Sequence, residues 1–270
     1  MKIKCGITGH TGVLGRRVIK KLPFKFIKFK GDVTKKNQLK NWFKKNKLDI
    51  VLHLAAIVPT DVVKKNIKRA YKVNFGGTKN IVDEISKNSQ IKWFFFSSTS
   101  HVYDFSNKKI SENYKLLPKT IYGSTKVKAE KYIIKKLRKK RFCIGRIFSF
   151  TGKGQSEKFV VPSIIKKIKS KKKVVEFTNL EHFRDFVSLD DISNAILCLC
   201  KKNSSGIFNI GNGKKILLSD IPRKLSKKQN KKIIISKNKI TTSLIANNSK
   251  LKKLGWIPKS NIDDILKELT

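Results

Sequence analysis

Acidic residues are scarce in this chain. Its 270 residues include 18 Asp and Glu against 63 Lys and Arg, a formal net charge of +45. An excess this large is typical of proteins that bind nucleic acids. Arginine is also scarce, however, and Lys is spread along the whole chain, whereas nucleic-acid readers depend on the planar guanidinium. The pattern therefore favours compositional drift and predicts no specific nucleic-acid partner.

Cysteine and long apolar runs are scarce as well. Cys5, Cys143, Cys198 and Cys200 show no CxxC spacing, which argues against a zinc knuckle or a disulfide framework and predicts reduced, mostly buried thiols. The 4 histidines have no metal-ligand spacing, so no metal is expected. No apolar run reaches the ~20 residues that cross a bilayer, and no signal-peptide pattern precedes the first apolar segment. The expectation is a cytoplasmic protein with no membrane partner.

Short apolar segments alternate with segments of helical periodicity through the first half of the chain. Strands are predicted at 3–7, 24–29, 49–56, 91–98 and 142–148, and helices at 13–22, 34–45, 73–85 and 122–140. The strands are apolar without a period of two, which indicates a parallel sheet covered by helices on both faces. After about residue 150 this alternation loosens, and a smaller second lobe is predicted there.

A glycine-rich segment, TGHTGVLG, separates the first predicted strand from the first predicted helix. Gly9, Gly12 and Gly15 permit a tight turn and allow a pyrophosphate to approach the backbone. The helix that follows offers free N–H groups and the positive end of its dipole to such an anion. The G-x-x-G-x-x-G spacing differs from the commoner G-x-G-x-x-G, and a turn without a ligand is the alternative.

Two further features are expected to meet this turn. Tyr122 and Lys126 are four residues apart in a predicted helix and therefore share one face. Thr99 follows an apolar strand, and the carboxyl ends of parallel strands line the ligand crevice of such sheets. A tyrosine, a lysine and a threonine hydroxyl are thus predicted to lie together beside the glycine turn.

With these features in order, the chain resembles the extended short-chain dehydrogenase/reductases, and among them the nucleotide-sugar epimerase/dehydratase group. TGHTGVLG is similar to the group's T-G-x-x-G-x-x-G loop, NFGGTKN to its N-x-x-G-T stretch, SSTSHVY to its S-S-[ST] signature and RDFVSLDD to its R-D-F-V-x-V-x-D motif. GDVT, HLAA, FNIGNG and LGWIP add to the likeness, which covers almost the whole chain.

This resemblance implies a fold, a cofactor and a set of site residues. The implied fold is α/β: a Rossmann-type doubly wound parallel sheet over 1–150, which binds a dinucleotide, and a smaller C-terminal substrate-binding lobe over 151–270, some segments of which return to the first domain. The cofactor is NAD or NADP. The implied catalytic residues are Thr99, Tyr122 and Lys126. The implied substrate-binding residues are Thr99, Ser100 and Arg184, the last for the phosphates of a nucleotide sugar. The implied cofactor-binding residues are Gly9, Thr11, Gly12, Val13, Leu14, Gly15, Asp32, Val33, Leu54, Ala55, Ala56, Asn74, Tyr122, Lys126 and Phe148.

The expected chemistry follows from the tyrosine. A free Tyr has a pKa of ~10, and the cationic Lys126 together with an oxidised nicotinamide is expected to lower it. Tyr122 then exchanges a proton with a sugar hydroxyl or carbonyl that Thr99 also hydrogen-bonds. Hydride moves between the sugar carbon and the nicotinamide.

Departures from the group narrow the reaction. Sugar 4,6-dehydratases of the group have Asp-Glu after the active-site Thr, whereas Ser100 and His101 stand here, so dehydration is not expected. The remaining possibilities are C4 epimerisation and reduction of a 4-keto sugar. Ser149 replaces an Asn that often holds the substrate pyrophosphate in the group. A module that keeps the fold without turnover, sensing the cofactor or associating with nucleic acid, is the alternative function.

Three smaller points stay open or serve as expectations. NAD and NADP are not separated, because Asp32 suits a ribose whereas Lys28, Lys30 and Arg17 suit a 2′-phosphate. Asp191 is expected to cap the helix that follows it. A homodimer through the Tyr-Lys helix is predicted from its apolar residues, which are Val127, Ile133, Ile134 and Leu137.

Overall fold

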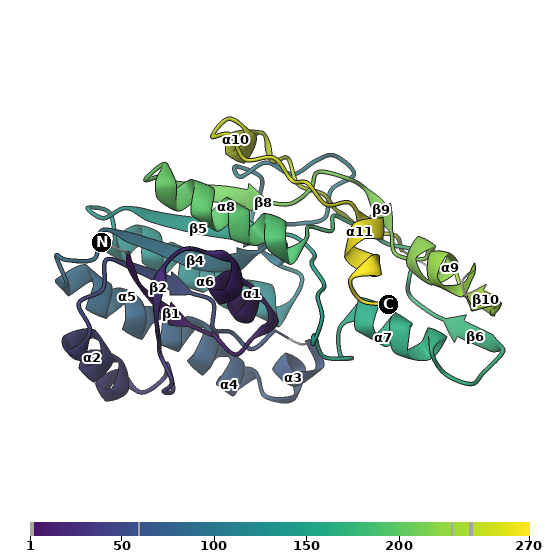
Figure 1. The fold of residues 1–270 in the computed structure, drawn as a ribbon, viewed down its shortest axis with the longest axis horizontal. Helices are drawn as coiled ribbons and strands as arrows, with labels where there is room; N and C mark the ends of the chain where they lie inside the picture. Colours follow the sequence, from purple (N-terminus) through teal and green to yellow (C-terminus); the bar gives the residue numbers. More distant parts are fainter. Residues whose placement is uncertain (1–2, 59, 228, 238–239) are drawn as a thin grey trace.

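The computed structural model describes residues 3–58, 60–227, 229–237 and 240–270. Within these ranges, six parallel strands form the central sheet in the order β2-β1-β3-β4-β5-β8 (Figure 1). The strands are β1 (Lys4–Thr8), β2 (Lys25–Lys28), β3 (Ile50–His53), β4 (Trp93–Thr99), β5 (Phe142–Ile147) and β8 (Gly206–Ile210). The chain moves outward from β1 in both directions, so a crevice opens beyond the carboxyl ends of β1 and β3. The parallel Rossmann-type sheet expected from the sequence is confirmed.

Helices cover both faces of this sheet. Helices α1 (Val13–Lys21) and α8 (Leu189–Lys201) pack on one face, and α2 (Lys36–Lys45), α5 (Thr78–Lys87) and α6 (Ile121–Lys136) on the other. Successive residues of β4 alternate between the two hydrophobic clusters, with Phe95 in the first and Phe94 and Phe96 in the second. Because both faces are buried, the first four residues of the strand are all apolar and show no period of two.

The connection between β3 and α5 is more helical than the sequence pattern indicated. Helices α3 (Thr60–Lys65) and α4 (Ile67–Tyr71) and a π-helical turn (Lys72–Gly77) precede α5, whereas one helix over 73–85 was predicted. Strand β3 ends at His53, and Leu54 to Ala56 leave the sheet toward the crevice, so the predicted strand over 49–56 was too long at its C-terminal end. Helix α6 similarly ends at Lys136 and not at 140.

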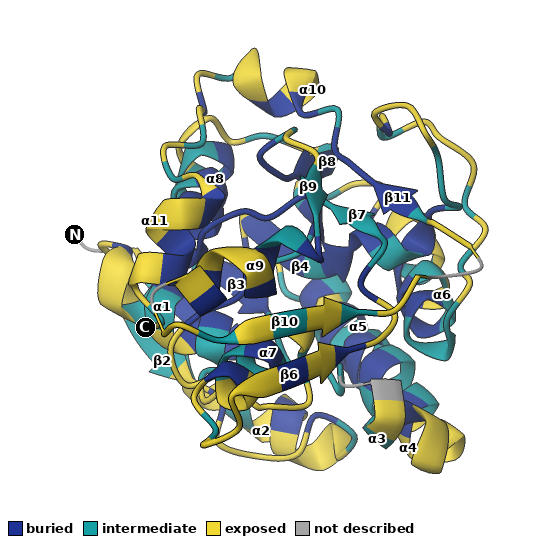
Figure 2. Cartoon of the chain, turned by 90° about the vertical axis from the view of Figure 1, so that its right-hand side faces the viewer, coloured by how far each residue is buried: buried dark blue, intermediate teal, exposed yellow. Residues whose placement is uncertain are grey.

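A smaller lobe lies at the right of Figure 1. Helices α7 (Val160–Ile168), α9 (Asp220–Lys227) and α11 (Ile262–Lys267) pack around one hydrophobic cluster with the paired strands β6 (Val174–Phe177) and β10 (Lys232–Ile235). Figure 2 shows exposed and covered residues alternating along β6 and β10, as expected when one face of a small sheet meets solvent. A three-stranded sheet of β7 (Phe183–Arg184), β9 (Ile216–Leu217) and β11 (Ser243–Leu244) lies between the lobe and the large sheet.

Segments after residue 151 return to the large sheet. Strand β8 pairs with β5, α8 packs against α1, and the short helix α10 (Ser249–Lys252) lies on β8. The boundary at residue 150 stays a prediction, because a single cut does not describe a chain that crosses between the lobes.

The cap of α8 differs from the expectation. Ser188 is the N-cap, and its hydroxyl accepts a hydrogen bond from the Asp191 N–H. The Asp191 carboxylate instead accepts from the backbone N–H groups of Lys259 and Ser260, at 2.9 and 3.0 Å. Asp191 therefore joins α8 to the chain before α11, which explains why it is buried.

The apolar surface of α6 is smaller than the sequence suggested. Ile133 and Leu137 are buried in the chain's own core and Val127 packs against a neighbouring cluster, whereas Ile134 is 42% exposed. The homodimer stays a prediction with less support than before. The four cysteines are free thiols, of which Cys5 and Cys143 are buried. Among the described residues, no helix combines the length and the apolar character needed to cross a membrane.

Candidate active site

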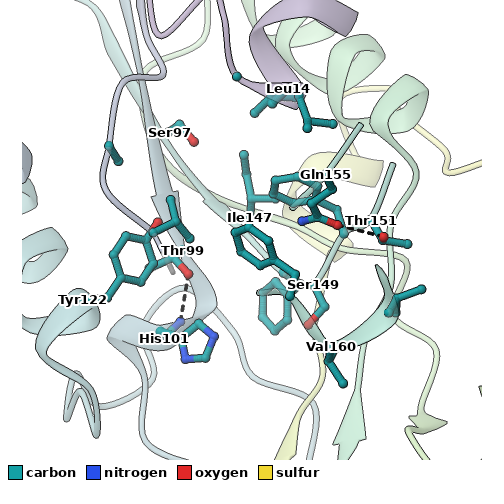
Figure 3. A pocket seen from close by; sticks show the side chains of 18 of the residues that line it. Leu14, Ser97, Thr99, His101, Tyr122, Ile147, Ser149, Thr151, Gln155 and Val160 are labelled. Carbon is teal, nitrogen blue, oxygen red and sulfur yellow. Dashed lines mark hydrogen bonds between the residues drawn. The ribbon is translucent and has the colours of Figure 1, made fainter. Parts of the chain in front are cut away.

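A cavity of about 720 Å³ opens at the carboxyl ends of β1, β3, β4 and β5. Figure 3 shows Ser97, Thr99 and Tyr122 on one side of it and Thr151, Gln155 and Val160 on the other. The first side belongs to the large sheet and α6, and the second to the chain that leads into α7. Leu14, from the start of α1, lies at one end of the view. The cavity therefore joins the glycine turn, the catalytic candidates and the smaller lobe.

The glycine turn is shaped by two close backbone contacts and by the cavity. Gly9 has a φ of 72°, and a Cβ placed on it would come within 2.5 Å of the Ala55 nitrogen. A Cβ on Gly15 would collide with the Gly9 carbonyl oxygen. At Gly12, by contrast, the one neighbour within 4 Å of such a Cβ is that same oxygen, at 3.4 Å. The packing of the chain alone explains Gly9 and Gly15, and the cavity explains Gly12.

The start of α1 is suited to an anion. Gly12 is the N-cap and supplies no side-chain hydrogen bond, so the N–H groups of the first turn are not capped by it. Gly12, Val13, Leu14 and Gly15 all line the cavity. Free N–H groups and the positive end of a helix dipole at a cavity wall fit the pyrophosphate of a dinucleotide.

The three catalytic candidates meet in this cavity. Thr99 is the last residue of β4, Tyr122 lies in the first turn of α6, and Lys126 follows one turn later. The Lys126 ammonium donates a 2.7 Å hydrogen bond to the Ser97 carbonyl oxygen and lies 4.5 Å from the centre of the Phe96 ring. Helix α6 is fixed at this point by Thr120, whose hydroxyl accepts from the Gly123 N–H at 3.0 Å.

Burial sets the proton affinities of the Tyr-Lys pair. Burial lowers the pKa of Lys126 to about 7, opposed by the charge of Glu130. Burial raises the pKa of Tyr122 above its usual range, and a hydrogen bond with Thr99 opposes that rise. The expected lowering of the Tyr122 pKa by Lys126 is not found in the chain by itself, where burial dominates and Thr99 provides the opposing hydrogen bond. Tyr122 is consequently a neutral phenol in the chain alone, able to donate a proton.

Arg184 and His101 line the cavity beyond Thr99. The Arg184 guanidinium donates to the carbonyl oxygens of Phe183 and Thr242 and to the Thr242 hydroxyl. Burial lowers its pKa to about 10, which leaves it charged near neutrality. Among the ion pairs between described residues, none involves Arg184. Burial, and then the Arg184 charge, lower the pKa of His101 to about 4, so its imidazole is neutral.

The expected cofactor residues fall into two groups. Those that line the cavity are Gly9, Gly12, Val13, Leu14, Gly15, Leu54, Ala56, Tyr122, Lys126 and Phe148. Those that the cavity lining does not include are Thr11, Asp32, Val33, Ala55 and Asn74. Asp32 is exposed and accepts a 2.8 Å hydrogen bond from the Thr34 N–H, while Val33 is buried in the core. Of the expected substrate residues, Thr99 and Arg184 line the cavity and Ser100 is buried beside it.

Asn74 belongs to a buried polar network. Its amide oxygen accepts from the Ile57 N–H at 2.8 Å, and its nitrogen donates to the Ile57 carbonyl and the Thr125 hydroxyl. Thr78 donates to the Asn74 carbonyl and also bonds His53, which in turn bonds Thr8 at 2.6 Å. This network ties the strand before the glycine turn to the first turns of α6, so Asn74 positions the cavity walls in this structure.

Sequence reasoning missed several residues that line the cavity on both of its sides. Ser97, Thr120, Gln155, Phe159, Asn179 and His182 also line the cavity. Most of them lie in loops, where neither periodicity nor a motif marks a residue. Ser97 and Thr120 did carry a signal, because each lies within three residues of a catalytic candidate.

A glycine turn leading into a helix, a parallel sheet, and a Tyr-Lys pair at the strand ends together define a dinucleotide-binding protein of the short-chain dehydrogenase/reductase type. The chain belongs to the NAD dependent epimerase/dehydratase family, whose model matches residues 5–211. The free N–H groups at α1, the space at Gly12 and the buried Lys126 fit a nicotinamide dinucleotide, which is the cofactor of this family, as NAD or NADP.

Three known proteins show the range of this family. The chain is 29% identical over 237 residues to dTDP-4-dehydro-6-deoxyglucose reductase of Escherichia coli, covering 83% of this chain and 75% of that protein. It is 31% identical over 223 residues to dTDP-D-glucose 4,6-dehydratase of Dictyostelium discoideum, covering 77% and 51%. The structure of RMD from Pseudomonas aeruginosa, complexed with NADPH, has a TM-score of 0.89 at 20% identity and covers 100% of this chain and 98% of that one. This last likeness bears on the fold alone.

Proposed function

We propose that the chain is an NAD(P)-dependent enzyme that reduces or epimerises C4 of a nucleotide-linked hexose. The observation that carries this proposal is the meeting of Thr99, Tyr122 and Lys126 in the same cavity as the glycine turn. The match to a 4-keto sugar reductase over 83% of the chain favours reduction. Epimerisation stays the second candidate, because it uses the same three residues.

The proposed roles follow from the geometry. A nicotinamide dinucleotide held by the glycine turn and Lys126 would supply the hydride chemistry needed at C4 of the sugar. Tyr122 gives its phenolic proton to the C4 oxygen during reduction, and the Thr99 hydroxyl orients that oxygen. Lys126, held by the Ser97 carbonyl oxygen, has a pKa of about 7 in the chain alone; a phenolate formed beside it would favour its protonated form, whose charge stabilises that phenolate. Arg184 holds the substrate diphosphate with a charge that no carboxylate of the described residues neutralises.

Dehydration is not part of this proposal. Among the described residues that line the cavity there is no Asp or Glu. The two positions after Thr99 hold a buried serine and a neutral histidine, so no carboxylate is available to remove a C5 proton. The match to a 4,6-dehydratase covers half of that protein and does not by itself decide the reaction.

The test offers the purified chain nucleotide-linked 4-keto-6-deoxyhexoses together with NADH or NADPH. Reductase activity consumes the reduced nicotinamide in proportion to the 4-hydroxy sugar formed. Epimerase activity interconverts C4-epimeric nucleotide hexoses with no net change in the cofactor. A protein that binds NAD(P) and turns over none of these sugars supports the alternative of a non-catalytic module. Conversion of a nucleotide-linked hexose to its 4-keto-6-deoxy form, with loss of water, contradicts the exclusion of dehydration.

A further inference from the structure

The turn between β6 and β7 carries a polar cluster that the proposed mechanism does not use. Asn179 and His182 line the cavity beyond Arg184, and Thr242 lies behind them. Asn179 has a φ of 60°, which an Asn adopts more readily than most residues but which still costs energy. The amide is thus held at the cavity by a strained turn.

The contacts between these residues show in which order they follow one another along the cavity. The His101 N–H donates to the Thr99 hydroxyl at 3.3 Å, His101 and Arg184 line the same cavity, and Arg184 and His182 both bond the Thr242 hydroxyl. His182 then bonds Asn179. Asn179 is consequently the member farthest from the catalytic threonine along this series of contacts. In a nucleotide sugar that extends from Thr99 past Arg184, the part that reaches Asn179 is the nucleoside. Val160 and Leu218, which also line the cavity on this lobe, offer apolar surface to a flat base.

Two groups that can only donate, the Arg184 guanidinium and the Thr242 backbone N–H, give the directions of the hydrogen bonds at the His182 Nδ1. Arg184 can only donate, so the Thr242 hydroxyl oxygen accepts from it at 3.0 Å and turns its own hydrogen toward the His182 Nδ1, 3.2 Å away. The Thr242 backbone N–H donates to that same nitrogen at 3.2 Å. Nδ1 is therefore an acceptor, which places the proton of the neutral imidazole on Nε2.

This tautomer in turn fixes the Asn179 amide. The His182 Nε2–H donates to the Asn179 Oδ1 at 2.9 Å. The opposite orientation of the amide would set two N–H donors against each other. The amide therefore presents its NH₂ group to the cavity, and among the described residues that nitrogen donates to no acceptor.

We infer that Asn179, oriented by His182, Thr242 and Arg184, reads the base of the nucleotide substrate and selects bases with a keto oxygen at C4 of a pyrimidine or C6 of a purine. Uracil, thymine and guanine offer such an acceptor, whereas cytosine and adenine offer an amino group at the corresponding edge. An NH₂ group facing an amino group makes no hydrogen bond across the contact, and a bound base would cover the Asn179 side chain, which is exposed in the chain alone. The inference rests on the proposed nucleotide-sugar function.

The experiment measures binding of UDP, dTDP, GDP, CDP and ADP to the full chain by calorimetry, with saturating NADP⁺. The wild type is expected to bind the three keto-base diphosphates about 3- to 10-fold more tightly than the other two, the ratio expected for one neutral hydrogen bond. Asn179→Asp presents an acceptor in place of the donor and is expected to shift the preference toward CDP and ADP. His182→Ala frees the amide to turn over and is expected to bring the ratio close to one.

Thr178→Ala, on the same turn but outside the cavity lining, is the matched control and should keep the wild-type ratio. Equal affinity of the wild type for all five diphosphates, or an unchanged preference in Asn179→Asp, overturns the inference. If such a protein still turns over nucleotide sugars, the proposed function stands. If none of the five diphosphates binds, the nucleotide-sugar function fails, and the inference with it.

Discussion

Two regions of this molecule shield an arginine from solvent, Arg146 fully and Arg184 in part, and the partners they give it differ. Between β5 and α6, Arg146 is 2% exposed and donates to the Glu130 carboxylate at 2.7 Å and to the Tyr103 hydroxyl at 2.9 Å. Burial disfavours its charge, but the hydrogen bonds with Glu130 raise its pKa above the usual value. At the cavity, Arg184 has neutral partners, and burial lowers its pKa.

The difference distinguishes a charge that is neutralised within the fold from a charge that is available to a ligand. A buried charge is tolerated when an opposite charge and hydrogen bonds compensate for its lost hydration. Arg146 has that compensation within the chain, through Glu130 of α6 and Tyr103, which lies in the segment after β4. Arg184 lacks it, and it lines the cavity of the candidate active site. The first arginine should therefore control stability and the second should control binding.

The largest expected effect is on kcat and concerns Tyr122 in the active-site cavity. Replacing Tyr122 by Phe removes one oxygen and keeps the ring, so the fold and cofactor binding should survive. Proton transfer to the sugar oxygen should fail, and kcat should fall by about 10²- to 10⁴-fold. The measurement is steady-state turnover of the nucleotide sugar, with thermal unfolding as the control. Thr99→Val should lower kcat less than Tyr122→Phe does. Near-normal turnover in Tyr122→Phe, with loss in Thr99→Val, would show that the acid–base residue is wrongly assigned.

Arg146→Met should lower the free energy of unfolding by about 3–5 kcal/mol, because it leaves the Glu130 carboxylate buried and unpaired. Chemical denaturation measures this loss. The double variant Arg146→Met/Glu130→Leu removes both charges and should recover part of it. A single variant as stable as the wild type would contradict the structural role given to Arg146.

Arg184→Met should leave stability nearly unchanged and should raise KM for the nucleotide sugar by about 10- to 100-fold, since hydrogen bonds to charged groups contribute about 1.5–3 kcal/mol. Initial rates at varied substrate concentration give KM and kcat separately. Arg184→Lys keeps the charge without the planar fork and should recover only part of the affinity. An unaltered KM in Arg184→Met would remove the binding role.

The last expected effect is confined to acidic pH and concerns His53, which is fully buried between Thr8 and Thr78. Burial, and then the charge of Lys126, lower its pKa from 6.5 to about 3. Between these pH values the unfolded chain binds a proton that the folded chain does not. Stability should therefore fall as the pH drops from about 6.5 toward 3, by up to about 1.4 kcal/mol per pH unit from this residue.

Denaturation at a series of pH values measures this slope, and His53→Gln should flatten it. His101 adds to the same slope, with a pKa of about 4, and Asp185 opposes it, because burial raises its pKa to about 6. The comparison of wild type with His53→Gln isolates the contribution of His53 to this slope. Parallel curves for the two proteins would mean that His53 carries a proton in the folded state.

The sequence by itself determined the parallel sheet, the glycine turn and the family. Each depends on local information: apolar strands without a period of two, glycine where two backbone segments touch, and a four-residue spacing that places Tyr122 and Lys126 on one helix face. Local patterns determine these features because they follow from the geometry of a single strand, turn or helix. The local patterns were less accurate at the ends of strands and helices, where β3 and α6 stop short of their predicted limits.

Tertiary structure alone decided what each polar residue faces. The N-x-x-G-T resemblance assigned Asn74 to the cofactor, whereas the fold encloses it in hydrogen bonds with Ile57 and Thr125. No pattern distinguished Asn179 and His182 from other loop residues, and they line the cavity only because β6 and β7 bring their turn beside Arg184. The charge partner of an arginine is likewise a matter of distance in space, so Arg146 and Arg184 look alike in sequence. A side chain's surroundings come from segments far apart along the chain, and folding is what brings those segments together.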